Sequence, residues 1–462
     1  MGQRIRNPPA ERRRAAATAG ADATGIGPKR SQRDRLLNAM IELAGRGGYQ
    51  SVSVAQVSSA AGVSRATFYE QFGDKEDCLL AAWRVAAERL LQEQPPPSRD
   101  GEWPDAARSL LRQVAHALQR DPDAGRLLFV EMPTGGDRTR ATRRAVLDAF
   151  EQRVEEFISI PLRDGRTVDV PPIALVGAMR SIIARYLRSQ SEDELAALAD
   201  DGITWVLSYA SSGSERWSTG AEATLAQRPS LPTTEAAEPR PRRLPRGRHG
   251  LPAGVIARSQ RTRIIHGTAE VMRSKGYENA TVADIVSAAG VSRDVFYEHF
   301  ADKQDAFLEA QQHPTQHILD TCASSYFSAE DWLERVWRTL GSLVELIVAN
   351  PSISHLRLVE CYAAGPDAIR RAEEITRSFT IFLEEGYRTT GHEQELPRLC
   401  SLAIAGAIFE IIQRDVRRGD GDGLRARLPQ LTYIATAPFV GPELAIARLR
   451  ELSAGHGAVL AV

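Results

Sequence analysis

The chain has 462 residues, of which 43% are hydrophobic and 25% are charged, and its formal net charge is −1. This balance excludes a polycation, so any contact with nucleic acid must come from local basic patches. No apolar run approaches the roughly 18–20 residues that span a bilayer, and no apolar segment follows the N-terminal arginines, so we expect a cytoplasmic protein without membrane contact.

One sequence pattern occurs twice along the chain. Residues 31–77 align with residues 259–305 without a gap, and roughly half of the aligned positions are identical. The likeness continues more faintly, since Trp103 matches Trp332 and Gly177 matches Gly406. A repeat of this length is near domain size, so the sequence predicts a duplicated domain rather than a solenoid.

Helical periodicity runs through both copies, and no sustained alternation indicates strands, so the predicted fold class is all-α. The stretch between the copies is rich in Ser, Pro, Thr, Arg and Gly, which is typical of a linker. These patterns divide the chain into a disordered basic arm at 1–29, a small helical domain at 30–90, a larger helical domain at 91–211, a disordered linker at 212–257, a second small domain at 258–318 and a second larger domain at 319–455.

The first helix of each small domain is marked by apolar residues at helical spacing, from Leu36 to Ala44 in the first copy. Gly47 and Gly48 end that helix, and Gly276 ends its counterpart. Both copies are therefore predicted to begin with one amphipathic helix that stops at glycine.

Two short helices joined by a tight turn follow in each copy. Ser53 is expected to cap the first of them, and Gly62 permits the turn. Ser64 then caps the next helix, in which Phe68 and Phe72 lie one turn apart on the buried side. The outer surface of that helix is left with Arg65, Ala66, Thr67, Tyr69 and Gln71. In the second copy Thr281 and Ser292 take the capping positions, and the outer surface carries Arg293, Asp294, Val295, Tyr297 and His299.

This arrangement is typical of a helix-turn-helix, whose second helix enters the major groove of DNA. A guanidinium suits guanine edges, and a hydroxyl suits phosphate. A plain helical hairpin with a solvated face is the alternative. At these residues the chain resembles the tetracycline-repressor (TetR) family of bacterial transcriptional regulators, through "SVAQVSSAAGVSRATFYEQFGDKEDCLL" and "TVADIVSAAGVSRDVFYEHFADKQDAFL".

The resemblance implies two TetR-like units, each a three-helix DNA-binding domain followed by a helical effector and dimerisation domain, with the helix-turn-helix at about 53–72 and 281–300. It also implies a DNA-binding set of groove-facing, backbone-contacting and phosphate-binding residues. That set is Ser53, Ser64, Arg65, Ala66, Thr67, Tyr69, Gln71, Lys75, Thr281, Ser292, Arg293, Asp294, Val295, Tyr297, His299 and Lys303, in which Lys75, Lys303 and the helix starts at Ser53 and Thr281 are expected to bind phosphate.

The two outer surfaces differ in their first turn. Asp294 and Val295 stand where the first copy has Ala66 and Thr67. An aspartate there suits the helix dipole and can accept from cytosine N4, but it repels phosphates. We expect the two copies to prefer different half-sites, or the second copy to bind more weakly.

Late segments of both larger domains are apolar on more than one face, which is typical of helices that bury a second face on a partner. We expect residues 171–210 to pair with residues 396–440 in an intramolecular pseudo-dimer, with close approach at Gly177 and Gly406. A dimer of tandem chains with four DNA-reading domains is the rival arrangement.

Chemical motifs are few. His313 and His317 have a metal-like spacing but no third ligand. The four cysteines have no metal or redox spacing; they are Cys78, Cys322, Cys361 and Cys400. No metal site and no cofactor are therefore expected. Candidate ligand-pocket residues on the amphipathic helices are His116, Glu131, Arg180, His355, Glu360 and Glu410.

We expect a non-enzymatic regulator that binds a double-stranded DNA operator and represses until a small-molecule effector releases it. The alternative is a helical ligand-binding module or enzyme whose helix-turn-helix segments no longer bind DNA.

Overall fold

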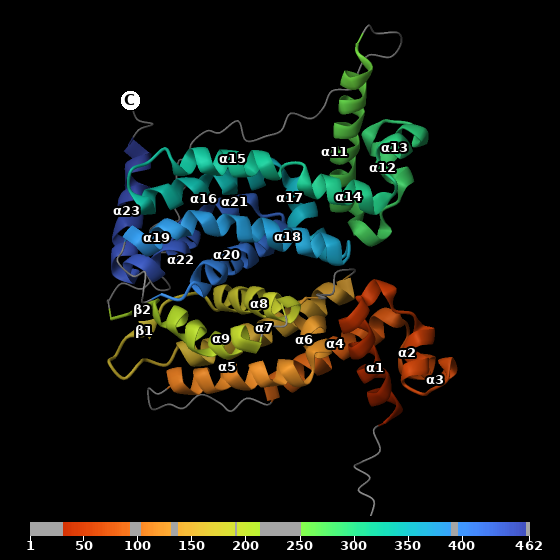
Figure 1. Ribbon diagram of the computed structural model, residues 1–462, viewed down its shortest axis with the longest axis horizontal. Helices are drawn as coiled ribbons and strands as arrows, with labels where there is room; N and C mark the ends of the chain where they lie inside the picture. The colour runs from red at the N-terminus through yellow and green to blue at the C-terminus, as the bar shows by residue number, and fades with distance from the viewer. Residues whose placement is uncertain are drawn as a thin grey trace, which may run out of the picture.

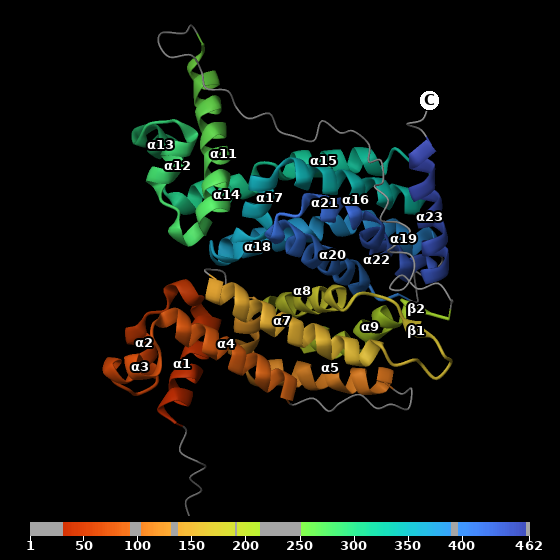
Figure 2. The ribbon, with the colours of Figure 1, turned by 180° about the vertical axis from the view of Figure 1, so that it is seen from behind.

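The computed structural model describes residues 31–92, 103–130, 137–189, 192–212, 251–389 and 396–458. These residues form two small helical units at one end of the molecule and two larger helical units that pack against each other (Figures 1 and 2). We name them head 1 (31–92), body 1 (103–212), head 2 (251–312) and body 2 (315–458). The all-α class and the tandem duplication predicted from the sequence are both confirmed.

Each head contains four helices, of which the second and third are short and joined by a tight turn. Head 1 consists of α1 (Gln32–Gly47), the 3-10 turn η2 (Tyr49–Ser51), α2 (Val54–Ala60), α3 (Arg65–Gln71) and α4 (Lys75–Gln92). Head 2 consists of α11 (Ala253–Asn279), α12 (Val282–Ala289), α13 (Arg293–His299) and α14 (Lys303–Gln312).

Local sequence explains these bounds. The four expected caps each accept a hydrogen bond from the backbone N–H three residues on: Ser53, Ser64, Thr281 and Ser292. Gly62 and Gly290 both turn the chain at a φ of 62°, a value that residues with a Cβ rarely adopt. The helix-turn-helix expected in each copy is therefore present in both heads.

Body 1 surrounds a core with long helices that run away from head 1. Its elements are α5 (Trp103–Arg120), α6 (Pro122–Phe129), α7 (Asp137–Ile158), β1 (Thr167–Val168), α8 (Pro172–Ser189), α9 (Glu192–Leu207) and β2 (Ala210–Ser211). The two short strands pair antiparallel, with Thr167 opposite Ser211 and Val168 opposite Ala210. This strand pair was not predicted, because two residues are too few for a visible alternation of apolar and polar side chains.

Body 2 repeats this arrangement with additional short elements. They are α15 (Thr315–Tyr326), α16 (Trp332–Ala349), α17 (Pro351–Leu358), η4 (Glu360–Tyr362), α18 (Pro366–Ser378), η5 (Phe379–Leu383), α19 (Glu384–Thr389), α20 (Leu399–Arg418), α21 (Gly421–Ala426), α22 (Leu428–Val440) and α23 (Pro442–Ala458). The order of α5, α6 and α8 in body 1 thus corresponds to that of α16, α17 and α20 in body 2.

One boundary differs from expectation. The linker was expected to reach residue 257, but α11 already begins at Ala253. Pro252 precedes this helix, and a proline at a helix start removes only an N–H that would lack an intrahelical partner. Residues 213–250 of the expected linker and the expected arm at 1–29 lie outside the described residues.

The two bodies meet along α8 and α20, which cross at paired glycines. A Cβ on Gly177 would lie 2.9 Å from the carbonyl oxygen of Gly406, and one on Gly406 would lie 3.0 Å from that of Gly177. The helices can approach this closely only because both positions lack a side chain. Tyr209 adds a hydrogen bond of 2.7 Å from its hydroxyl to the carbonyl of Ile434 on α22. The close approach predicted at Gly177 and Gly406 is present.

Candidate functional site

The second helix of each helix-turn-helix is anchored in the same way in the two heads. Phe68 of α3 and Phe296 of α13 are fully buried, and each packs on a second buried phenylalanine one turn later, with ring centroids 5.7 and 5.8 Å apart. These anchors leave Tyr69 and Tyr297 outside, with 58% and 48% of their surfaces exposed. Large exposed aromatic side chains of this kind are suited to contact a partner.

The arginines of the two outer faces differ in their surroundings. The guanidinium of Arg65 is exposed and makes no hydrogen bond to another described residue. Arg293 instead lies over its neighbour, with Nη2 3.5 Å from the hydroxyl of Tyr297. Beside it Asp294 is exposed in the first turn of α13. Head 1 therefore presents a free cation, whereas head 2 presents a cation shared with a phenol and next to a carboxylate.

Lys75 and Lys303, which were expected to bind phosphate, each direct the ammonium group to carbonyls of their own head. The Lys75 Nζ donates to the carbonyls of Val52 (2.8 Å) and Tyr49 (3.3 Å) and lies 4.0 Å from the centre of the Tyr49 ring. Lys303 makes the same contacts in head 2, with the carbonyls of Tyr277 and Ala280. Partial burial lowers the pKa of both lysines. Each ammonium thus ties the fourth helix of its head to the chain that follows the first.

His299 and Gln71 of the predicted DNA-binding set are not fully exposed. His299 is half-buried, and its Nε2 lies 3.4 Å from Oε1 of Gln260 on α11. Gln71 is also half-buried, and its backbone carbonyl accepts a hydrogen bond of 3.0 Å from Arg33 Nη1. The capping residues Ser53 and Thr281 remain exposed at the starts of α2 and α12, and their contact with phosphate stays a prediction.

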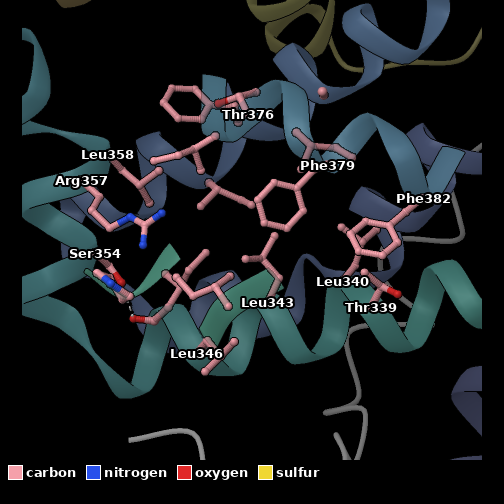
Figure 3. A pocket seen from close by; sticks show the side chains of 18 of the residues that line it. Thr339, Leu340, Leu343, Leu346, Ser354, Arg357, Leu358, Thr376, Phe379 and Phe382 are labelled. Carbon is pink, nitrogen blue, oxygen red and sulfur yellow. Dashed lines mark hydrogen bonds between the residues drawn. The ribbon is translucent and has the colours of Figure 1, made fainter. Parts of the chain in front are cut away.

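Each body encloses an apolar cavity of about 150 Å³ at an equivalent place. Body 1 lines its cavity from α5 with Ala107, Leu110, Leu111 and Val114. Body 2 uses the same four positions of the equivalent helix α16, which are Val336, Thr339, Leu340 and Leu343. Figure 3 shows the second cavity, with Leu343, Phe379 and Phe382 directed into it. Mostly apolar cavities with a few polar groups are typical of small-molecule sites.

Of the predicted ligand-pocket residues that the structure describes, only Arg180 lines a cavity. Arg180 lines the edge of the first cavity, whereas His116 is exposed on α5 and Glu131 lies outside the described residues. His355 and Glu360 join body 2 to head 2, since the Glu360 carboxylate accepts from the Tyr277 backbone N–H at 2.7 Å and lies 3.3 Å from His355 Nε2. The cavities are lined mainly by apolar side chains, which sequence reasoning assigned to the core because a lining residue and a core residue share one pattern.

Glu410 lies at the interface between the bodies. Its Oε2 accepts from Arg180 Nε at 3.1 Å, and the two side chains are 4% and 8% exposed. Burial raises the pKa of Glu410, but the positive charges of Arg180, Arg143 and Arg417 outweigh burial and hold it below its ordinary value. The Arg180 guanidinium also donates to the hydroxyl of Tyr362 at 3.0 Å. This cluster joins α8 of body 1 to α20 and η4 of body 2.

In each copy one short helix lies between cavity and head. In body 2, α17 contributes Arg357 and Leu358 to the cavity wall, while its Leu356 is fully buried in the core of head 2. In body 1, α6 contributes Leu128 to the cavity wall and Asp123 to head 1, where Arg46 Nε lies 2.9 Å from the carboxylate. A ligand that moves α6 or α17 would therefore move a head.

Other kinds of site find no support in the part of the chain that the structure describes. No group of three or more His, Cys, Asp or Glu side chains there could hold a metal ion. No helix among these residues is long and apolar enough to cross a membrane. All four cysteines are buried and unpaired.

Comparison with known proteins finds a family match within each head. The family described as "Bacterial regulatory proteins, tetR family" matches residues 36–82 and 264–310. The HTH-type transcriptional repressor KstR of Rhodococcus jostii is 34% identical over 109 residues, which are 23% of this chain and 50% of that protein. The HTH-type transcriptional activator FasR of Mycolicibacterium smegmatis is 20% identical over 156 residues, which are 34% of this chain and 60% of that protein. The chain thus spans half to three fifths of these curated relatives.

Among solved structures, the match to the fatty acid degradation regulator FadR from Bacillus halodurans is 21% identical, covers 38% of this chain and 94% of that chain, and has a TM-score of 0.36.

Proposed function

We propose that this chain, a member of the TetR family of bacterial regulatory proteins, is a cytoplasmic, sequence-specific DNA-binding transcriptional regulator whose bodies receive a small-molecule effector. The observation that carries the proposal is the second helix of each helix-turn-helix, α3 in head 1 and α13 in head 2. Each is capped by a serine and exposes an arginine and a tyrosine. Arginine is the commonest side chain to read guanine in the major groove. Both heads lie at the same end of the molecule (Figures 1 and 2).

The two heads are proposed to read unlike half-sites of one operator. The scaffold contacts are the same in both, since Lys75 and Lys303 hold equivalent carbonyls. The first turns of α3 and α13 differ, with Ala66 in one and Asp294 in the other. An exposed carboxylate in that turn disfavours a nearby phosphate and favours a cytosine amino group. We therefore expect an operator without true two-fold symmetry.

The effector is proposed to act through α6 and α17. Each of these helices has one side in a cavity and the other against a head, so occupation of the cavity favours one head position over another. A ligand shifts such an equilibrium only by its difference in affinity for the two states. We expect the ligand-free state to bind DNA and the liganded state to release it, which is repression relieved by ligand.

A single chain is proposed to act as its own dimer. Pairing of unlike bodies places Arg180 against Glu410. At the positions equivalent to these, body 2 has Phe409 and body 1 has Ser181. Two copies of body 1 would bury Arg180 without this carboxylate, and two copies of body 2 would bury Glu410 without this arginine. Because a buried unpaired charge costs several kcal/mol, pairing within the chain is favoured.

Selection from a random pool of double-stranded DNA tests the proposal. The purified chain is expected to enrich one asymmetric site at physiological salt in the presence of competitor DNA. The variant Arg65→Ala should relax the preference at one end of the site, and Arg293→Ala should relax it at the other. Absence of any enriched sequence would instead favour a ligand-binding module whose heads do not bind DNA.

Light scattering on the free protein tests the pseudo-dimer. One chain should have the mass of a monomer at low micromolar concentration. A mass of two chains would favour the rival dimer of tandem chains with four heads.

A further inference from the structure

The second cavity contains a buried arginine with an unused donor. Arg357 of α17 lines this cavity and is 8% exposed, and Figure 3 shows its guanidinium directed into the cavity. Its Nη2 donates to the Thr315 hydroxyl at 3.2 Å, but its Nη1 is buried without a hydrogen-bond partner in the described part of the chain. Unpartnered buried donors are rare in folded proteins and cost free energy.

No described carboxylate lies near enough to balance this charge. Burial is the cause that lowers the pKa of Arg357, to about 10, and no acidic group opposes it. The contrast with Arg180 is clear, because the carboxylate of Glu410 accepts a hydrogen bond from that guanidinium at the body interface. Arg357 thus remains a cation in a site where charge is normally paired.

The hydroxyl groups at the cavity wall donate to backbone carbonyls, and His317, which also lines the cavity, is exposed. The hydroxyl of Thr339 donates to the carbonyl of Arg335 at 2.8 Å, that of Thr376 to Ala372 at 2.9 Å, and that of Ser354 to Ile347 at 3.0 Å. The charged donor of Arg357 is therefore the strongest polar feature that this cavity offers a ligand.

The first cavity has no charged donor of this kind, although the indole N–H groups of Trp103 and Trp205, which line it, are buried without a hydrogen-bond partner among the described residues. Leu128 of α6 occupies the position equivalent to Arg357, counted from the matching prolines that begin α6 and α17. The arginines that line the first cavity are already paired, Arg153 with Glu156 at 2.8 Å and Arg180 with Glu410. The two cavities lie at equivalent places in their bodies and have similar volumes, but only the second contains an unpaired positive charge.

We propose that the second cavity binds a small apolar molecule bearing one carboxylate, which accepts a hydrogen bond from Arg357 Nη1, and that the first cavity selects neutral apolar molecules. An ionised acceptor satisfies both the free donor and the unbalanced charge. The apolar walls take up the rest of the ligand. This inference rests on the proposed function only for its regulatory meaning, since the binding step itself involves no DNA.

The size of the cavity suggests the probes. An apolar cavity of about 150 Å³ in another protein holds benzene. Phenylacetate joins such a ring to a carboxylate, and phenylacetamide has the same shape without the charge. Hexanoate and hexanamide form an aliphatic pair that separates the demand for a carboxylate from a demand for an aromatic ring.

Calorimetric titration of the full chain without DNA gives the test. We expect the second cavity to bind phenylacetate about 10- to 100-fold more tightly than phenylacetamide, the range that one charge-assisted hydrogen bond supplies. The variant Arg357→Met should lose this preference while its thermal unfolding midpoint stays the same or rises, because an uncompensated buried charge has been removed. Arg153→Met is the matched control in the first cavity and should keep the preference.

Three results would overturn the inference: equal affinity of the wild type for acid and amide, a preference that survives in Arg357→Met, or a preference that is lost in Arg153→Met. If Arg357→Met does not fold, Arg357→Lys retains the charge and loses the forked donor, and its preference should fall. DNA binding of the ligand-free protein is measured separately, so failure of carboxylate binding leaves the proposed regulator standing, and failure of DNA binding leaves the cavity result standing.

Discussion

Replacing Glu410 by glutamine leaves a cluster of buried arginines without the carboxylate that they share. The Glu410 side chain is 4% exposed and accepts from Arg180, while Arg143 and Arg417 also act on its charge. Removing one member of a buried ion pair typically costs 3–5 kcal/mol, because the remaining charge stays buried. Glutamine keeps an oxygen that can accept from Arg180, so we expect the lower end, about 3 kcal/mol, for Glu410→Gln.

The reverse deletion should cost less. In Arg180→Met the Glu410 carboxylate still faces Arg143 and Arg417, so no charge of opposite sign is left alone. We expect a loss of about 1 kcal/mol, which is near the value of one net hydrogen bond. The control Glu384→Gln breaks an exposed pair with Arg398, where the side chains are 40% and 66% exposed, and such pairs contribute about 0–1 kcal/mol.

Urea unfolding followed by tryptophan fluorescence measures these free energies of unfolding. The expected order of loss is Glu410→Gln, then Arg180→Met, then the control. Equal losses for Glu410→Gln and Arg180→Met would refute the shared-carboxylate reasoning, because they would mean an isolated pair. A loss for Glu410→Gln no larger than that of the control would mean that the interface is solvated.

The same cluster predicts a dependence on pH. The folded state holds the pKa of Glu410 below its ordinary value of about 4.3. A lowered folded pKa contributes stability above the unfolded pKa, and this contribution disappears as the pH falls through the folded pKa. The stability gap between the wild type and Glu410→Gln should therefore be constant from pH 7 to pH 6 and shrink below about pH 4.3. A stability gap that widened on acidification would mean that the folded state raises the pKa of Glu410, contrary to this reasoning.

Further expectations concern the heads and the body interface. Arg65→Ala should weaken specific DNA binding by about 1–3 kcal/mol, mostly at one base pair, in a mobility shift against operators changed at single positions. Lys75→Ala should lower the free energy of unfolding by about 1–3 kcal/mol, since two carbonyls lose a charged donor. It should leave the salt dependence of DNA affinity unchanged, and a slope reduced by about 1 would show instead that Lys75 contacts a phosphate. Gly177→Ala should cost about 1–3 kcal/mol, because its Cβ would lie 2.5 Å from that of Glu410, whereas Gly202→Ala, whose Cβ would lie 3.5 Å from Leu111, should be neutral or stabilising.

Local signals were sufficient for much of the fold. The caps at Ser64 and Ser292 and the glycine turns follow from residues a few positions apart, and the structure has them where the sequence predicts them. The paired glycines of α8 and α20 were also predictable, because the internal repeat aligns Gly177 with Gly406 and a two-faced helix needs a second partner.

Long-range contacts were not predictable from the same signals. Lys75 looked like a surface charge beside a DNA-reading helix, yet its partners are the carbonyls of Tyr49 and Val52, more than twenty positions earlier. The candidate pocket residues were chosen for their polarity, whereas the cavities are lined mainly by Leu, Ile, Val and Phe. Arg357 stands between Leu356 and Leu358 in α17, but this local pattern does not distinguish a buried arginine from an exposed one.

The differences between the two copies have a common physical meaning. The contacts that build each head recur, since Arg33 and Arg261 lie over equivalent phenylalanine rings as the lysines lie over equivalent tyrosines. The copies diverge at the outer face of the second helix-turn-helix helix, at the cavity wall and at the body interface. In a symmetric homodimer each of these changes would occur twice, and Arg180 and Glu410 would each occur on both sides of the axis. Fusion of the copies in one chain lets a positive charge on one side meet a negative charge on the other, so each half can acquire its own ligand and its own half-site without losing its partner.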